Sequence, residues 1–289
     1  MSTPAQRTDS ARQPVVLRFT GLLPQRLLRF RRPVWWQELL LIGIGYFLYG
    51  RVRNAIPGKN AIAFKHARGI QHLQEALHLN FELSLNHFVA AHASVAQVMN
   101  YYYATLHFVV TPGVLLWLFT RRPAIYRGLR TVLFATSLIA LACFYLYPLA
   151  PPRLLPQYGY IDTILKFHTW GSLADPNIAQ HSNQFAAMPS LHTAWALWCG
   201  IAIACCVQRT WIRVVALLYP LCTVVVIVGT ANHFVIDAVG GALTLAAGFV
   251  VQLLLSGHGA FTAPVDTPLS ELPDQERISE RDQDISRHA

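Results

Sequence analysis

The sequence has few charged residues: 13% of its 289 residues are Asp, Glu, Lys or Arg, whereas 54% are hydrophobic. Such a composition is too apolar for a soluble domain and is typical of a protein that crosses a membrane several times. The net charge of +9 is spread over short arginine runs beside apolar segments, as in the cytoplasmic anchors of membrane proteins. We therefore expect an integral membrane protein that does not bind nucleic acid.

Three other patterns are absent from the sequence. The five cysteines all lie inside apolar segments, and their odd number provides no disulfide framework. Residues 1–32 lack the apolar stretch of a cleavable signal peptide. No His-Glu-x-x-His sequence occurs, so the most recognisable zinc-enzyme motif is missing. We expect no chemistry from the cysteines and no cleavage near the N-terminus.

Six apolar segments approach the length of about 20 residues that an α-helix needs to cross a bilayer. They are Trp35–Tyr49, Tyr101–Phe119, Leu129–Tyr147, Leu191–Val207, Val214–Gly229 and Phe234–Leu255. The sequence therefore predicts an all-α fold, a polytopic integral membrane protein whose catalytic domain covers residues 33–255 with six transmembrane helices.

Residues 51–98 are neither apolar enough to cross a membrane nor polar enough to be disordered. Apolar residues such as Ile70, Leu73 and Leu77 recur there at helical spacing. This pattern predicts two amphipathic helices that lie on the outer face of the membrane.

The arginines indicate the orientation of the chain. Residues 1–32 contain seven of them and are predicted to form a basic cytoplasmic arm on anionic headgroups. The connections 121–130 and 209–213 are also rich in arginine and are placed inside by the same rule. Residues 256–289 contain seven of the fourteen acids, which predicts a disordered cytoplasmic tail. Both termini are thus expected inside the cell membrane, with the fourth and sixth spans beginning at its outer face.

Two histidines and one carboxylate lie where these outward-facing spans begin. Asp237 is the only acid between Asp175 and Asp266, and an ionisable residue inside a membrane is a functional hypothesis by default. His233 precedes it by one helical turn, close enough for the carboxylate to hold one imidazole proton and leave the other nitrogen nucleophilic. His192, from a different span, is suited to protonate a leaving oxygen.

A phosphate is the group that these residues are best suited to attack. Pro189, Ser190 and Leu191 open a helix, and its free N–H groups with the Ser190 hydroxyl form an anion site. Arg153, at the outer end of the third span, can donate two hydrogen bonds to phosphate oxygens. Weaker basic candidates on the same face are Lys166, Lys59, Arg51 and Arg53.

The segments Pro-Ser-Leu-His192 and His233-Phe-Val-Ile-Asp237 resemble the second and third signatures of the type 2 phosphatidic acid phosphatase superfamily. The stretch Ala-Pro-Pro-Arg153 is similar to its inositol phosphorylceramide synthase-like, or inositolphosphotransferase, branch. The resemblance covers roughly residues 100–255. It implies a six-helix core and a phosphohistidine mechanism in which His233 is the nucleophile, Asp237 orients it, and His192 acts as acid and then as base.

The sequence departs from the superfamily pattern in two places. The lysine-then-arginine-proline signature is absent, with Arg153 as its best substitute, and Ile227 stands where the wider family has an arginine before the nucleophilic histidine. The phosphate charge must therefore be met by other residues. His107, in the middle of the second predicted span, is interpreted as an interhelical hydrogen bond and not as a site residue.

We predict an enzyme that transfers the phosphorylated headgroup of a phospholipid or lipid phosphate to a lipid alcohol, with the site facing outward. No cofactor is required because the imidazole itself is the nucleophile. One alternative is a phosphatase that transfers the same group to water. A proton-coupled transporter is a second, although its site would lie near the midplane of the membrane. A metalloenzyme is a third, because two histidines and a carboxylate can bind a metal ion.

Overall fold

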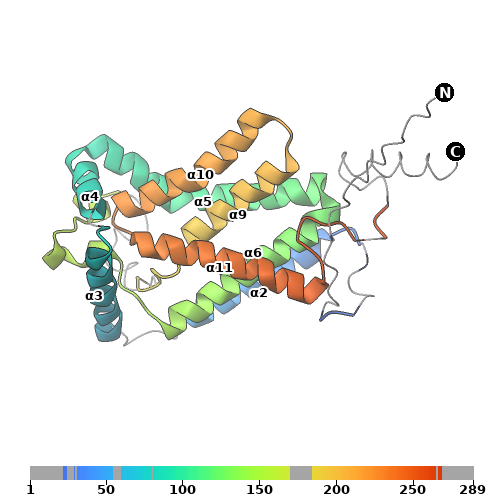
Figure 1. The fold of residues 1–289 in the computed structure, drawn as a ribbon, viewed down its shortest axis with the longest axis horizontal. Helices are drawn as coiled ribbons and strands as arrows, with labels where there is room; N and C mark the ends of the chain where they lie inside the picture. Colours follow the sequence, from blue (N-terminus) through green and yellow to red (C-terminus); the bar gives the residue numbers. More distant parts are fainter. Residues whose placement is uncertain are drawn as a thin grey trace, which may run out of the picture.

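The computed structural model describes residues 22–24, 29, 31–54, 60–79, 81–169, 184–264 and 266–268 (Figure 1). Within these ranges all regular elements are helices and no β-strand occurs, so the predicted all-α membrane fold is confirmed. Most of the predicted basic arm 1–32 and of the predicted tail 256–289 lies outside the described residues.

Long helices run roughly along one axis of the molecule (Figure 1). They are α2 (Trp35–Asn54), α5 (Ala93–Arg121), α6 (Pro123–Leu146), α10 (Thr210–Gly229) and α11 (Val235–Ser256), joined by the shorter α9 (Leu191–Cys206). By length and apolarity, α5, α6, α10 and α11 can cross a membrane, whereas α9 is apolar but has only 16 residues. The count of six spans stays a prediction, with α2 and α9 at the first and fourth predicted positions.

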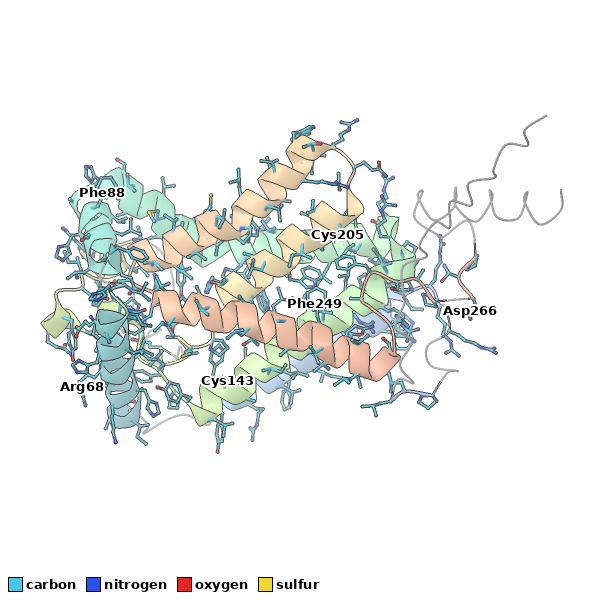
Figure 2. The ribbon with its side chains drawn as sticks, in the orientation of Figure 1. Arg68, Phe88, Cys143, Cys205, Phe249 and Asp266 are labelled. Carbon is cyan, nitrogen blue, oxygen red and sulfur yellow. The ribbon has the colours of Figure 1, made fainter. Side chains whose placement is uncertain are left out.

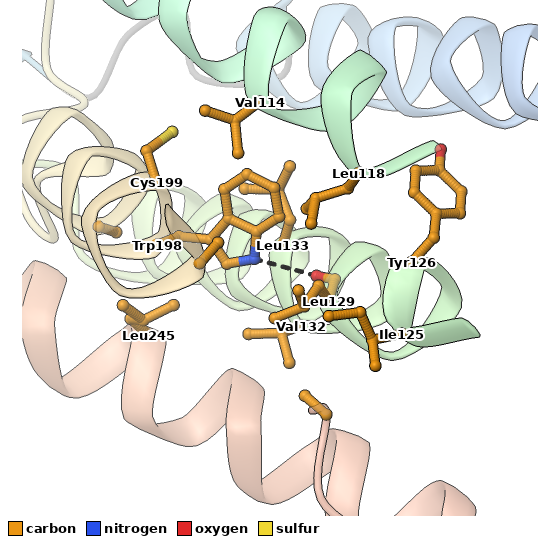
Figure 3. Close-up of a cluster of buried hydrophobic side chains, with 13 residues drawn as sticks. Val114, Leu118, Ile125, Tyr126, Leu129, Val132, Leu133, Trp198, Cys199 and Leu245 are labelled. Atoms are coloured by element: carbon orange, nitrogen blue, oxygen red, sulfur yellow. Dashed lines mark hydrogen bonds between the residues drawn. The ribbon is translucent and has the colours of Figure 1, made fainter. Parts of the chain in front are cut away.

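Helix α9 packs against α5, α6, α10 and α11 and forms the centre of the bundle. Its Trp198 is fully buried between Val114, Leu129 and Leu245 (Figure 3). The indole N–H of Trp198 donates a hydrogen bond of 3.0 Å to the Leu129 carbonyl. Because an unsatisfied donor is costly away from water, this bond fixes the orientation of a large side chain and thereby the depth of α9 in the bundle.

Helix α2 is attached to the bundle through one polar side chain. Glu38 is its only buried side chain among those that the structure describes. The Glu38 carboxylate accepts a hydrogen bond from the Tyr126 hydroxyl at 2.9 Å and pairs with Arg130, both on α6. The other described side chains of α2 are exposed or partly exposed, as expected for a helix at the lipid-facing edge.

Helices α3 (Asn60–Ala76) and α4 (Phe81–Ala91) cross one end of the bundle (Figure 1). We call them the α3–α4 layer; they fall in the segment predicted to contain two amphipathic helices. Beside them lie the short elements η1 (Pro152–Leu154), η2 (Pro156–Tyr158) and α7 (Thr163–Lys166). The bundle end with this layer is also the end where α11 begins and α10 finishes (Figure 1).

The buried side of the α3–α4 layer contains polar residues beside apolar ones such as Ile70 and Val89, which the spacing of its apolar residues did not indicate. Gln74, Glu82 and Asn86 are at most 2% exposed, whereas Leu77 and Phe88 are more than half exposed. Figure 2 shows Phe88 at the outer side of this end of the molecule. Some large apolar residues thus lie on the outward surface, and the buried polar ones pair with the ends of α10 and α11. The layer is also shorter than residues 51–98, since α5 already begins at Ala93.

Candidate active site

The structure brings His192 and His233 together at the end of the bundle covered by the α3–α4 layer. His192 lies in the first turn of α9, and His233 lies in the turn between α10 and α11. Their ring centroids are 5.6 Å apart. Two histidines from separate helices can therefore contact one bound group.

The protonation of His233 follows from its hydrogen bonds. Its Nδ1 is 2.8 Å from the carbonyl oxygen of Ala187 and 3.4 Å from Oδ2 of Asp237. A carbonyl oxygen can only accept, so Nδ1 carries the hydrogen. In the neutral ring the lone pair is then on Nε2. Nδ1 therefore donates its shorter hydrogen bond to a backbone carbonyl and not to the expected acceptor, Asp237.

Asp237 holds the turn that presents His233. Its Oδ2 accepts a hydrogen bond of 2.9 Å from the backbone N–H of Phe234, the N-cap residue of α11. Its backbone carbonyl accepts from the N–H of Ser190 at 2.9 Å. The carboxylate is fully buried, and its Oδ1 has no hydrogen-bond partner among the described residues. Asp237 therefore links His233 to the Pro-Ser-Leu-His segment and keeps one acceptor unused.

Ser190 begins α9 and uses its hydroxyl as a helix cap. The Oγ atom lies 3.4 Å from the N–H of Thr193 and 3.3 Å from its hydroxyl. A Cβ atom at Gly241 would collide with the Ser190 carbonyl, so this glycine allows α9 and α11 to approach closely. Ser190 thus lies beside His192 as predicted, but its hydroxyl is partly committed to the helix.

The ring of His192 lies between two side chains of α5. Tyr103 is stacked on it with centroids 4.3 Å apart, and His107 meets it at 72° with centroids 4.4 Å apart. Nδ1 of His107 is buried and has no hydrogen-bond partner among the described residues. The sequence predicts that His107 lies outside the site, whereas the structure places its ring against that of His192. Tyr103 and His107 are four residues apart on one helix and therefore lie on the same face, and this spacing was the available sequence signal for their shared contact.

Arg153 lies against the turn that carries His233. Its backbone N–H donates to the Ala231 carbonyl at 2.8 Å, and its side chain forms an ion pair of 2.9 Å with Asp162. Arg153 is 7% exposed, and its Nε has no hydrogen-bond partner among the described residues. One donor of the fork is therefore occupied by Asp162, and another is buried and unused.

The remaining basic candidates have other positions. Nζ of Lys166 donates to the Ala90 carbonyl at 2.8 Å, at the C-terminal end of α4. Arg51 is exposed on α2, and both Lys59 and the side chain of Arg53 lie outside the described part of the chain. Ile227 is fully buried among apolar neighbours that include Val228, so an arginine there would have to be placed in an apolar core.

The described residues contain no cluster of three His, Cys, Asp or Glu side chains arranged to hold a metal ion. Most titratable side chains of the site instead contact one another through ring packing and hydrogen bonds. The ring of His192 contacts α5 on one side and lies near His233 on the other, and His233 contacts Asp237 of α11. Such an arrangement suits nucleophilic and acid–base chemistry by imidazole groups.

The comparisons with known proteins give one match. A family model described as the PAP2 superfamily matches residues 68–251, which is more than half of the chain and includes both histidines. No curated protein and no solved structure matches the chain.

Proposed function

The chain belongs to the type 2 phosphatidic acid phosphatase (PAP2) superfamily, and from this membership we propose that it transfers a lipid headgroup phosphate through a phosphohistidine intermediate. The superfamily makes it a membrane enzyme of the phosphatase or phosphotransferase type, with lipid phosphates as substrates. One observation supports the mechanism most strongly. His233 is held by two acceptors at Nδ1, which leaves Nε2 as the lone-pair atom, and His192 is its neighbour.

In the first step Nε2 of His233 attacks phosphorus, and the bond between phosphorus and the leaving oxygen breaks. His192 donates its proton to that oxygen, so the lipid alcohol leaves neutral. In the second step His192 takes a proton from the incoming hydroxyl, whose oxygen attacks phosphorus and releases His233. Asp237 and the Ala187 carbonyl stabilise the positive charge that develops on His233, because both lie at Nδ1.

Arg153 and the N-terminus of α9 are the proposed binding groups for the phosphate oxygens. The buried, unused Nε of Arg153 supports this role, because an orphan donor beside the turn of His233 gains a partner when an anion binds. Ser190 contributes through the helix N-terminus that it begins. Lys166 is a weaker member of the set, because its ammonium would have to leave the Ala90 carbonyl.

Transfer to an alcohol is proposed over hydrolysis for two reasons. The stretch Ala-Pro-Pro-Arg153 is similar to the inositolphosphotransferase branch. The α3–α4 layer covers the end of the bundle where the histidines lie (Figure 1), and a covered site would disfavour water relative to a bound lipid hydroxyl. The rival within the superfamily is a phosphatase. A transporter is less supported, because His192 lies in the first turn of α9 and His233 precedes α11, and neither lies near the middle of a spanning helix.

The test is a partition ratio. Purified protein in vesicles receives a radiolabelled phosphoinositide or similar donor together with a lipid alcohol, and the products are separated by thin-layer chromatography. Mostly new phosphodiester supports transfer, whereas mostly free headgroup phosphate or inorganic phosphate identifies a phosphatase. His233→Ala provides the blank, and a competent His233→Ala protein would contradict the mechanism itself.

The site is proposed to face the outside of the cell membrane, with both termini in the cytoplasm. Arg121 and Arg122 lie at the C-terminal end of α5, at the end of the bundle away from the α3–α4 layer (Figure 1), and clusters of arginine mark the cytoplasmic side. His192 and His233, on the side of the layer, then face outward.

A further inference from the structure

Glu82 lies in the first turn of α4 and is 1% exposed. Its Oε1 accepts a hydrogen bond of 2.5 Å from the backbone N–H of Val235, and its Oε2 accepts from Nε2 of Gln74 at 2.9 Å. Oε1 of Gln74 in turn accepts from the N–H of Ile236 at 3.3 Å. The first N–H groups of a helix have no partner within that helix. In α11 two of them are taken by side chains of the α3–α4 layer.

The first turn of α11 determines the positions of several site residues. Asp237 follows Ile236, and its carboxylate holds the Phe234 N–H and faces His233. Its backbone carbonyl also receives the N–H of Ser190. A shift of the turn therefore changes the distance between His233 and Asp237 and the position of the segment that presents His192. We propose that Glu82 is a positioning residue for the reaction, which acts as a neutral carboxylic acid to lock the first turn of α11.

The hydrogen-bond network favours a proton on Glu82. The Tyr160 hydroxyl lies 3.1 Å from Oε1 of Gln71 and 3.3 Å from Oε2 of Glu82. The amide of Gln71 donates from Nε2 to Glu75, so its oxygen is left facing Tyr160. One hydroxyl proton cannot serve both acceptors. If Glu82 carries a proton on Oε2, it donates to Tyr160, Tyr160 donates to Gln71, and every group is satisfied.

The surroundings of Glu82 act in the same direction. Burial raises the pKa of Glu82 to about 7, against hydrogen bonds from Val235, Gln74 and Tyr160 that lower it. The titratable groups that act on Glu82 and Tyr160 are acids or phenols: Asp237 from α11, Tyr160 from the segment before α7, and Glu75 from α3. The histidines nearby pair with other acids of the network, His233 with Asp237 and His72 with Glu75. Among the described residues no basic side chain forms an ion pair or hydrogen bond with Glu82. Ionisation would therefore place a second negative charge beside Asp237.

The first test is hydrogen exchange, which does not depend on the proposed function. Glu82→Ala removes the acceptor of the Val235 N–H, and Gln74→Ala removes that of the Ile236 N–H. We expect the peptide with residues 234–237 to exchange on the order of tenfold faster in either variant, since each loses a bond that satisfies a buried donor. Ser84→Ala is the control, because Ser84 is exposed on α4, the helix that carries Glu82. Exchange in both variants equal to that of Ser84→Ala would overturn the proposal.

The second test rests on the proposed function and separates positioning from binding. Per folded protein, Glu82→Ala should lower kcat by about tenfold or more with KM little changed, since a misplaced catalytic group costs rate before it costs affinity. Glu82→Gln retains an acceptor for Val235 and a donor for Tyr160, although its amide nitrogen cannot accept from Gln74 as the oxygen of the acid does. It should therefore lose clearly less kcat than Glu82→Ala at pH 6. A loss in Glu82→Gln equal to that in Glu82→Ala would overturn the claim that the neutral form is the functional one. If Glu82→Ala does not fold, kcat and KM of Glu82→Gln are compared with those of wild type alone.

The third test is the pH dependence of hydrogen exchange. In wild-type protein the protection of residues 234–237 should decrease as pH rises from 6 to 8, whereas in Glu82→Gln it should stay constant. Equal pH dependence in the two proteins would overturn the role of the proton. If His233→Ala retained turnover, the phosphohistidine mechanism would fail, and the exchange results would still decide the role of Glu82.

Discussion

The imidazole of His107 meets that of His192 nearly at a right angle, with the ring centroids 4.4 Å apart. Tyr103, one turn earlier on α5, stacks on the same ring. The orientation of the proposed general acid therefore depends on a helix that contributes no residue to the signature motifs. This contact has a kinetic consequence.

We expect His107→Ala to lower turnover of lipid esters by about tenfold while p-nitrophenyl phosphate esters are affected little, because an activated leaving group needs no proton from His192. Steady-state rates on both substrates measure the difference. Val109→Ala is the control, since Val109 is 66% exposed. Equal losses on both substrates would assign His107 to packing alone.

The two histidines of the motifs should differ in the same assay. His233→Ala should abolish turnover of every substrate, because no bond to phosphorus forms without the nucleophile. His192→Ala should lose roughly 100- to 10,000-fold on alkyl esters, the usual contribution of a general acid, yet still form phosphoenzyme from the activated ester. Acid-labile, base-stable labelling of the protein would detect that intermediate; its absence from His192→Ala would remove the acid role.

Arg153→Lys should be markedly impaired although the charge is retained. A lysine cannot both pair with Asp162 and present a second donor in the plane of the fork, as the guanidinium does. The measurement is KM for the lipid donor, with thermal unfolding as the check on folding. A fully active lysine variant would show that Arg153 only links the loop to the Ala231 turn.

Single cysteines report the orientation in the membrane, in a background without the five native cysteines. A cysteine at Gln157, exposed in η2, should react with an impermeant thiol reagent added to intact cells. One at Arg122, between α5 and α6, should react only after the cells are opened. Reversed labelling would place the histidines on the cytoplasmic side.

Stability should fall as pH rises through neutrality because of Glu82. The pKa of this buried acid is raised from 4.5 to about 7, so the folded state binds the proton more tightly than the unfolded state does. The stabilisation is complete below pH 4.5 and is lost as pH rises through 7, to an extent of about 3 kcal/mol. Unfolding temperatures of wild type and Glu82→Gln should diverge in their pH dependence, and parallel curves would contradict this assignment.

The sequence could predict the neighbourhood of His192 and His233, because the arginine pattern directs both of their segments to one membrane surface. It could not predict the hydrogen bond from His233 to the Ala187 carbonyl, since every residue has such a carbonyl. The boundaries of the helices could not be predicted from the sequence either. Helix α6 begins at Pro123 and not at Leu129, because a helix continues past the apolar window that a hydropathy pattern detects.

Glu82 and its partners were missed for a different physical reason. Periodicity arguments assume that apolar residues face the protein interior and polar ones face water. On the α3–α4 layer the assumption holds only in part, since Ile70 and Val89 are buried but Phe88 is exposed while Gln74 and Glu82 are buried. Unpaired N–H groups at the start of α11 require acceptors, and the polar side of the layer supplies them.

Glu38 gives α2 a defined order of assembly. Its partners Tyr126 and Arg130 lie far along the chain, with Arg130 separated from it by 92 positions. A carboxylate that faces hydrocarbon without a partner is costly, and no other described side chain of α2 is buried. During synthesis, α2 therefore gains its specific attachment only after α6 has been made, so the order in which these two helices dock differs from their order in the chain.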